Sequence, residues 1–295
     1  DWLKWLPTDK TFCVYVTGKN SNLRHSHFTS LQVKNAIVDL QKATYGKRSN
    51  ICIYNPYLII HLHLHDNQAV LSLQSTVESL HKRGYRPSLG NAPLKENLAA
   101  GLMHITEWDG STPLIDLMCG SGTFLIEGIS NSLNIPNIKE NYLFKNWSDF
   151  NESIYSQEIS KIKNKPPKKQ KFSRVIGCEI DKAVYLQAKN NISLSGFSEF
   201  IEIHNKDFNN LQIGNIEPGI IVCNPPYGKK IGEEKALTEL YFKIGTSLKN
   251  NFSGWEFWLL SGNPLLTKYL RMKASLKIPV SNGGIDCRWI KYSIR

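Results

Sequence analysis

The chain shows two patterns of hydrophobic spacing, one before residue 84 and another after it. The first part contains three strand-like runs, at 12–16, 58–65 and 70–73. Apolar residues at helical spacing occupy 29–45, and the Gly46 that follows is typical of a helix end. Asp66-Asn67 lies between the last two runs and favours a β-hairpin. Residues 1–84 are therefore predicted to form a small α+β domain.

Strand-like and helix-like segments alternate over residues 85–295. Seven runs predict strands: 114–118, 175–179, 200–204, 220–223, 255–260, 276–280 and 287–294. Helical spacing is found in 93–108, 123–133, 182–194, 234–248 and 264–272. Pro93 is expected as the first residue of the first helix. The alternation is typical of an α/β domain with a mainly parallel seven-stranded sheet, and Asn282-Gly283-Gly284 predicts a C-terminal hairpin that adds one antiparallel strand.

Composition and charge indicate a globular protein with a polyanionic partner. Hydrophobic residues make up 41% of the chain and charged residues 21%, which excludes a disordered chain. The net charge of +11 favours nucleic acid over a membrane as the partner. Residues 161–171 hold six lysines and no acid, and we expect an exposed loop, more as a solvated insertion than as a dedicated RNA contact.

The cysteines and histidines do not predict a metal site. The six cysteines are scattered and none forms a CxxC pair, so we expect small core residues of a reduced, cytoplasmic protein. His61, His63 and His65 lie along one strand face without a nearby carboxylate or cysteine, which favours a solvated or RNA-facing surface. No apolar run is long enough to span a bilayer, and no membrane partner is expected.

The stretch Asn224-Pro225-Pro226-Tyr227 follows the buried run 219–223 and carries the most specific chemistry. Two prolines stop the strand and leave an amide side chain, bare carbonyls and an aromatic ring at its carboxyl end, where open α/β sheets bind ligands. This loop resembles the catalytic motif of S-adenosylmethionine-dependent methyltransferases that modify a planar nitrogen. The Asn224 side-chain oxygen and the Pro225 carbonyl can each accept one N–H of an exocyclic amine, while Tyr227 can stack on a base.

Two further strand ends carry candidate binding residues. Asp116 is followed by a loop in which Gly120 and Gly122 permit a tight turn just before a helix. Leu125 stands where a dinucleotide fingerprint needs a small residue, so a dinucleotide is disfavoured, and Asp116 suits a cationic ligand. Glu179 ends the next strand and can accept both ribose hydroxyls of a nucleoside, whereas Asp181 fits a helix cap.

Taken together, these motifs resemble the THUMP-domain guanine-N2 RNA methyltransferases, particularly the bacterial 23S rRNA enzymes. The resemblance rests on 18–39, LHKRGYR at 80–86, 92–100, DLMCGSGTFLIE, GCEID, NPPYG and NGGIDCRW at 282–289. It implies a Rossmann-like class I S-adenosylmethionine methyltransferase domain over 85–295, preceded over 1–84 by a partial THUMP RNA-binding domain. The implied substrate is 23S rRNA or a large-subunit precursor.

The resemblance also implies roles for the residues that hold the cofactor. The loop with Met118, Cys119, Gly120 and Gly122 would lie against S-adenosylmethionine, and Asp116 would face its amino-acid end. Asp207 would accept from the adenine amino group, Phe208 would lie against the ring, and the turn from Pro93 would lie near the methionine end.

Other readings of the motifs remain open. DNA adenine-N6 and protein glutamine-N5 methyltransferases share the NPPY motif, but the basic charge argues against a protein substrate and the THUMP-like half favours RNA. A non-catalytic RNA-binding assembly factor is the alternative from another class. The joint presence of Asp116, Glu179, Asp207 and Asn224 argues for an enzyme.

Overall fold

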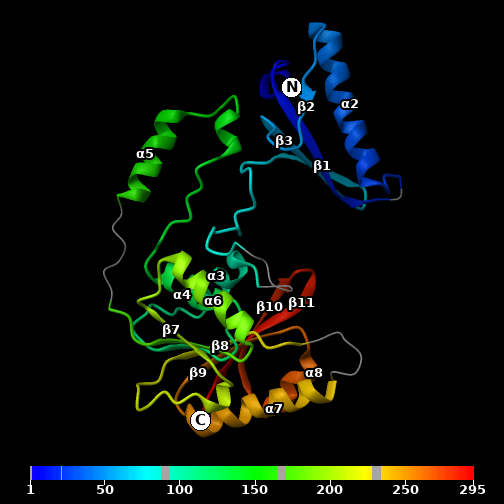
Figure 1. The fold of residues 1–295 in the computed structure, drawn as a ribbon. Helices are drawn as coiled ribbons and strands as arrows, with labels where there is room; N and C mark the ends of the chain where they lie inside the picture. Colours follow the sequence, from blue (N-terminus) through cyan, green and yellow to red (C-terminus); the bar gives the residue numbers. More distant parts are fainter. Residues whose placement is uncertain (1, 21, 88–93, 165–170, 228–233) are drawn as a thin grey trace. The chain divides into compact units, whose positions relative to one another are not determined.

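The computed structural model describes residues 2–20, 22–87, 94–164, 171–227 and 234–295 (Figure 1). The chain forms two compact units. The first unit comprises residues 1–79 together with 138–165, and the second comprises 80–137 with 166–295. None of the helices in the described ranges is both long and apolar enough to cross a bilayer.

The first unit contains a four-stranded sheet in the order β2-β1-β3-β4. Its strands are β1 (Thr11–Lys19), β2 (Asn50–Ile51), β3 (Leu58–His65) and β4 (Gln68–Leu73). The expected hairpin is confirmed, because β3 and β4 pair antiparallel around Asp66, whose φ is 49°. The helix α2 (Ser26–Tyr45) contributes Ile37 and Val38 to a core shared with the sheet, and it ends at Gly46 as expected.

Residues 138–165 leave the second unit and return to the first. Their regular elements are η1 (Leu143–Asn146) and α5 (Glu152–Lys163). Trp147, just after η1, packs edge-on against Trp5 of the short helix α1 (Trp2–Trp5). The Tyr57 hydroxyl donates to the Asn146 carbonyl at 2.7 Å, and the Asn146 amide donates to the Tyr57 carbonyl at 2.9 Å. The first unit therefore includes a segment that lies well beyond residue 84 in the sequence.

The expected loop over 161–171 is wrong for its first residues. Residues 161–163 form the last turn of α5, which begins where the Asn151 side chain accepts a hydrogen bond from the Ile154 N–H. Lysines suit the last turn of a helix because their charge interacts favourably with its free carbonyl groups. Residues 165–170 lie outside the described ranges.

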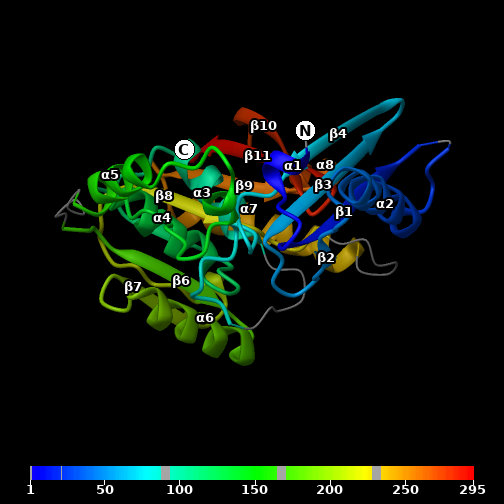
Figure 2. The same ribbon diagram turned by 90° about the horizontal axis from the view of Figure 1, so that it is seen from above.

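The second unit has a seven-stranded sheet in the order β10-β11-β9-β8-β5-β6-β7 (Figure 2). Its strands are β5 (Leu114–Asp116), β6 (Val175–Glu179), β7 (Ile201–Asn205), β8 (Ile220–Cys223), β9 (Glu256–Ser261), β10 (Ala274–Asn282) and β11 (Ile285–Ser293). All pairs are parallel except those of β11, which runs antiparallel to both β9 and β10. The predicted mainly parallel sheet with a C-terminal antiparallel hairpin is therefore confirmed.

Helices cover both faces of this sheet, as expected. One core contains side chains from α3 (Glu96–Ile105), α4 (Thr123–Ser132) and α6 (Lys182–Ser195). The core on the other face contains side chains from η2 (Phe208–Asn210), α7 (Glu234–Asn251), α8 (Pro264–Thr267) and η3 (Lys268–Leu270). A layer of helices on each face thus shields the central strands from water. Polar residues are then found at the strand ends.

Two predicted helices differ from the structure at their ends. The first begins at Glu96, with Lys95 in extended conformation before it, and not at Pro93, which lies outside the described residues. The helix expected over 264–272 divides into α8 and η3 and ends at Arg271, whose φ of 51° places it in the left-handed region. Backbone at that φ cannot continue a right-handed helix.

Candidate functional site

Three neighbouring strands bring candidate residues to one edge of the sheet. Asp116 ends β5, Glu179 ends β6, and Asn224 directly follows β8. Strand register aligns them, because Asp116 is paired with Gly177 of β6 on one side and Val222 of β8 on the other. The carboxyl ends of parallel strands therefore converge where the sequence predicts a ligand site.

The glycine loop after β5 is held close to the end of β6. The Cys119 N–H donates to the Cys178 carbonyl at 2.8 Å, and the Gly120 N–H donates to Glu179 Oε2 at 3.1 Å. Gly120 and Gly122 have φ values of 53° and 81°, which glycine adopts without the strain that a Cβ would cause. Gly122 is also the residue before α4, so the loop feeds directly into a helix N-terminus.

Asp116 is an unusual carboxyl group because it is buried, with 1% of its surface exposed. The pKa of Asp116 is raised to about 8, mainly because the carboxyl group is buried; a hydrogen bond from the Met118 N–H opposes this rise, and the neighbouring Glu179 charge adds to it. Desolvation favours the neutral form of a carboxyl group unless a cation comes close. The site therefore holds a carboxyl group that would ionise fully beside a positively charged ligand.

Glu179 makes contacts on both of its carboxylate oxygens. Oε2 accepts from the Gly120 N–H, and Oε1 accepts from the Asp181 N–H at 2.9 Å. Each oxygen has a further lone pair, so the group can also accept from hydroxyls. Asp181 itself caps α6 by accepting from Ala183 and Val184, as its position predicts.

Asp207 and Phe208 lie just after β7, where Asp207 is hydrogen-bonded to a neighbouring residue and Phe208 is packed into the core. One Asp207 oxygen accepts two hydrogen bonds from Asn209, from its N–H at 2.9 Å and its amide at 2.8 Å. Phe208 is 6% exposed and belongs to the core under α7, so most of its ring faces protein. Asp207 is therefore available at the edge through its second oxygen, whereas Phe208 offers little surface.

Asn224 carries a buried oxygen without a partner. Its Oδ1 accepts no hydrogen bond within the described parts of the chain, although the atom is shielded from solvent. Leaving a buried acceptor unpaired costs about 1–3 kcal/mol. An unpaired buried acceptor at this edge of the sheet is a candidate for contact with a bound ligand. Pro225, next in the chain, is buried and Pro226 is exposed.

Tyr227 is fixed by the C-terminal hairpin, which the sequence alone did not indicate. Its hydroxyl accepts from the Asn282 amide at 2.8 Å, and the Cys287 sulfur lies 3.8 Å from the same oxygen. A Cβ on Gly262 would lie 3.1 Å from the ring, so this residue must be small for the ring to sit where it does. Three segments distant in sequence thus determine the position of one aromatic side chain.

The junction before α3 supplies a buried charge network that sequence reasoning missed. The Arg86 guanidinium lies 3.0 Å from the Glu96 carboxylate, and both side chains are less than 5% exposed (3% and 4%). Arg86 also donates to the Thr123 hydroxyl at 3.2 Å, which ties the junction to the first residue of α4. The signal available in the sequence is the pair of arginines at 83 and 86 upstream of a helix that begins with an acid, Glu96.

A second part of this network stabilises the same junction. The Tyr85 hydroxyl donates to Glu127 at 2.9 Å, and the Arg83 guanidinium lies 3.5 Å from the other Glu127 oxygen. Burial raises the pKa of Glu127, and the Arg83 charge opposes that rise.

In the described ranges no group of three His, Cys, Asp or Glu side chains is arranged to hold a metal ion.

Comparisons with known proteins match both units. Residues 83–291 match the family model described as RMKL-like, methyltransferase domain, and residues 1–74 match the THUMP domain model. A Synechocystis sp. protein named as an RNA methyltransferase is 41% identical over 300 residues, which cover all of this chain and 77% of that protein.

Two further likenesses extend over the whole chain. The ribosomal RNA large subunit methyltransferase K/L of Vibrio parahaemolyticus is 34% identical over 299 residues. All of this chain is covered but only 42% of that protein, so the chain spans less than half of this relative. A solved structure described as a possible methylase from Clostridium difficile 630 has a TM-score of 0.86 at 27% identity, covering 100% of this chain and 77% of that one.

Proposed function

The chain belongs to the RMKL-like methyltransferase family, with a THUMP domain before the catalytic domain, and we propose that it methylates the exocyclic N2 of a guanine in 23S rRNA. The methyl donor is S-adenosylmethionine and the substrate class is RNA, as the family and the two relatives that match this chain along its whole length support. The choice of 23S rRNA draws on the name of the Vibrio relative, which acts on large-subunit ribosomal RNA. The cytoplasm is the compartment in which we propose that this reaction occurs.

The observation that carries the proposed chemistry is the buried, unpaired Oδ1 of Asn224. Pro225 follows Asn224 directly after β8, so its carbonyl would supply a second acceptor for the two N–H groups of one exocyclic amine. Accepting both hydrogens would hold the amine and direct its lone pair to one side. Orientation of this kind lowers the barrier by removing the entropy cost of alignment.

The strand-edge residues fit S-adenosylmethionine. The glycine loop with Met118, Cys119, Gly120 and Gly122 has the open backbone needed for close approach, and buried Asp116 is suited to the cationic amino group. Glu179 would accept from the ribose hydroxyls and Asp207 from the adenine amino group. When bound, the cofactor supplies a methyl group made electrophilic by a positively charged sulfur. Phe208 would contribute only the small part of its ring that is exposed.

The residues of this chain have positioning roles in transfer. Asn224 and Pro225 hold the acceptor nitrogen, while Tyr227 would lie against the base to be modified. A strong general base is unnecessary, because the amine becomes a much stronger acid once methylated and loses its proton readily. Pro226 stiffens the loop, which limits the motion of its neighbours.

Methyl incorporation tests the proposed reaction. The chain is incubated with labelled S-adenosylmethionine and an unmodified 23S rRNA transcript, and nucleosides from the digested RNA are identified by mass spectrometry. We expect N2-methylguanosine in the RNA. Incorporation into DNA as N6-methyladenine, into a protein glutamine, or into no acceptor despite cofactor binding would contradict the proposal.

A further inference from the structure

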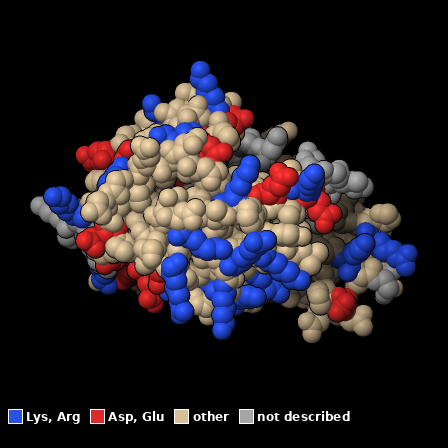
Figure 3. All heavy atoms as spheres, turned by 90° about the horizontal axis from the view of Figure 1, so that it is seen from below, with Lys and Arg blue, Asp and Glu red and all other residues tan. Residues whose placement is uncertain are grey.

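The positive charge of the chain is concentrated in its last fifth and not in residues 1–79, which contain the THUMP match. Residues 240–295 hold nine Lys and Arg against two Asp and Glu, a net charge of +7 out of the +11 of the chain. Residues 1–79 hold eight and five, a net charge of +3. One of the two C-terminal acids, Glu256, is already paired with Lys291 at 2.6 Å. Figure 3 shows Lys and Arg side chains gathered on the face seen from below.

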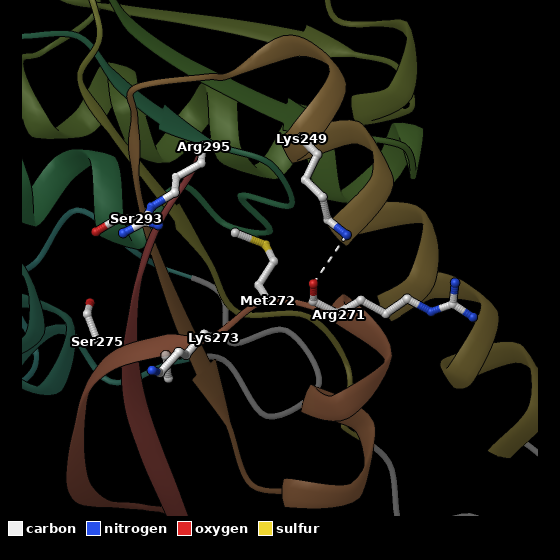
Figure 4. Close-up of a pocket in the computed structure, with 8 residues that line it drawn as sticks. Lys249, Arg271, Met272, Lys273, Ser275, Ser293 and Arg295 are labelled. Carbon is white, nitrogen blue, oxygen red and sulfur yellow. Dashed lines mark hydrogen bonds between the residues drawn. The ribbon is translucent and has the colours of Figure 1, made fainter.

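A pocket of about 450 Å³ lies within this basic segment (Figure 4). Lys249 near the end of α7, Lys273 just before β10 and Arg295 just after β11 contribute cationic side chains to its lining. Ser293 contributes a hydroxyl group, whereas the Ser275 hydroxyl donates to the Lys291 carbonyl at 3.1 Å. Ammonium, guanidinium and hydroxyl groups are the donors with which proteins bind phosphate oxygens.

The three cationic side chains are not neutralised by acids of the chain. Within the described ranges none of Lys249, Lys273 and Arg295 forms an ion pair with Asp or Glu. The Lys249 ammonium donates one hydrogen to the Arg271 carbonyl at 3.3 Å and has two more to offer. Lys249 also suits the carbonyl end of α7, but that role does not explain Lys273 or Arg295, which lie outside the helix.

The pocket lies at the opposite end of the sheet from the methyl-transfer edge. Ser293 is paired with Glu256 at the start of β9, whereas Leu259 further along β9 is paired with Cys223, the residue before Asn224. At about 3.3 Å per residue, these ends are separated by roughly 10–20 Å. The pocket therefore cannot hold the cofactor or the base that is methylated.

We propose that this pocket binds a phosphodiester group of the RNA substrate at a point remote from the methylated nucleotide. The proposal rests on the proposed function, since it adds a second contact to the same RNA. Only an RNA that extends along the catalytic domain can occupy the pocket and the strand edge together. The pocket would therefore favour a large, folded RNA over a short oligonucleotide.

Paired variants test this contact through RNA binding. Lys249→Ala/Lys273→Ala is compared with Lys182→Ala/Lys189→Ala, two exposed lysines on α6 at the other face of the sheet. Binding of a labelled 23S rRNA transcript and of a short single-stranded oligonucleotide is measured by fluorescence anisotropy over a range of salt. For the transcript we expect the pocket variant to bind about tenfold more weakly, and the slope of log Kd against log salt to fall by about 1.4–1.8, as for two lost phosphate contacts.

Control measurements and a conservative variant distinguish the possible outcomes. We expect oligonucleotide binding and S-adenosylhomocysteine binding to be unchanged, and Lys249→Arg/Lys273→Arg to restore transcript binding. Equal transcript affinity and salt slope in the pocket and α6 variants would overturn the proposal, as would an equal loss for the oligonucleotide. If the unaltered chain binds the transcript but does not methylate it, the proposed reaction fails while the pocket is still tested.

Discussion

Asn224 and Asp116 are both held in states that a bound ligand would relieve. Asn224 has a buried acceptor without a donor, and Asp116 has a buried carboxyl group without a cation. Each costs stability in the free chain: the Asn224 oxygen loses water without gaining a donor, and the single hydrogen bond from the Met118 N–H replaces only part of the hydration of Asp116. Residues of this kind gather at functional sites, and here two of them occupy the ends of adjacent strands.

Asn224→Ala should abolish methyl transfer while leaving cofactor binding intact. The substitution removes one of the two acceptors that hold the amine, so we expect kcat to fall by about a hundredfold or more, as when other preorganised hydrogen-bonding groups are removed. Single-turnover transfer to the RNA transcript measures the effect, and calorimetry with S-adenosylhomocysteine provides the control. Turnover close to that of the unaltered chain would refute the role assigned to this side chain.

Cofactor affinity should depend on pH through Asp116. The folded pKa of about 8 lies well above the ordinary pKa of an aspartate, so the stabilisation from the buried neutral group is fully present below the unfolded pKa and is lost as the pH rises to 8. A cationic amino group favours the ionised form, so binding releases a proton below pH 8. Below pH 8, S-adenosylhomocysteine affinity should therefore rise by up to about tenfold for each unit by which the pH is increased. Asp116→Asn should remove this dependence, and the same slope in that variant would contradict the explanation.

At the scale of elements, the catalytic loop depends on contacts made far along the chain. Tyr227 follows β8, but its hydroxyl bonds to the turn between β10 and β11 and its ring lies against Gly262 after β9. The junction before α3 is likewise joined to α4 through Arg86. Strands and helices that form the edge of the sheet therefore also hold the side chains of that edge in place.

A double-mutant cycle tests whether Asn282 acts through Tyr227. Asn282→Ala and Tyr227→Phe each remove the same hydrogen bond, and we expect each to lower kcat by about threefold to tenfold, with little further loss in the double variant. Ser281→Ala, an exposed neighbour, serves as the control. Fully additive losses in the double variant would show that Asn282 has a role independent of the tyrosine hydroxyl.

The Arg86–Glu96 pair should be sensitive to the loss of one partner only. Arg86→Met leaves a buried carboxylate without a counter-charge, and we expect the free energy of unfolding to fall by about 3–5 kcal/mol. Arg86→Met/Glu96→Leu removes both charges and should recover most of that loss. Urea unfolding measures all three proteins. A double variant as unstable as Arg86→Met would mean that the arginine contacts other than Glu96 dominate.

At the scale of the whole molecule, the chain passes between its two units three times, at 79–80, 137–138 and 165–166. Each unit has its own buried core. The catalytic edge consists of residues of the second unit, while the THUMP match lies in the first. Cofactor binding and RNA capture are thus assigned to separate cores connected by several segments.

The second unit should bind the cofactor without the first. A chain lacking residues 1–79, with a short Gly-Ser linker in place of 138–165, should keep its S-adenosylhomocysteine affinity within about threefold, because all the described contacts around the site lie within the second unit. Its affinity for the RNA transcript should fall by about tenfold or more. Calorimetry and anisotropy measure the two. RNA affinity equal to that of the full chain would contradict the assignment of capture to the THUMP unit.

Local sequence patterns determined most of the elements and their order. Hydrophobic spacing predicts the strands and helices of the second unit, and Gly46 and Asp181 act at the helix ends where their chemistry predicts. The ends of parallel strands meet at one edge in any such sheet. The sequence alone could therefore place Asp116, Glu179 and Asn224 at the same edge, because parallel polarity follows from the alternation of strands and helices.

Only the tertiary structure decided contacts between residues far apart in the chain. The Asn282 amide meets the Tyr227 hydroxyl, Arg86 is buried against Glu96, and residues 138–165 return to the first unit. The low exposure of Phe208 and the gathering of Lys249, Lys273 and Arg295 around one pocket also emerged only there. The physical reason is that periodicity and turn chemistry are local, whereas burial and long-range pairing depend on how whole elements pack.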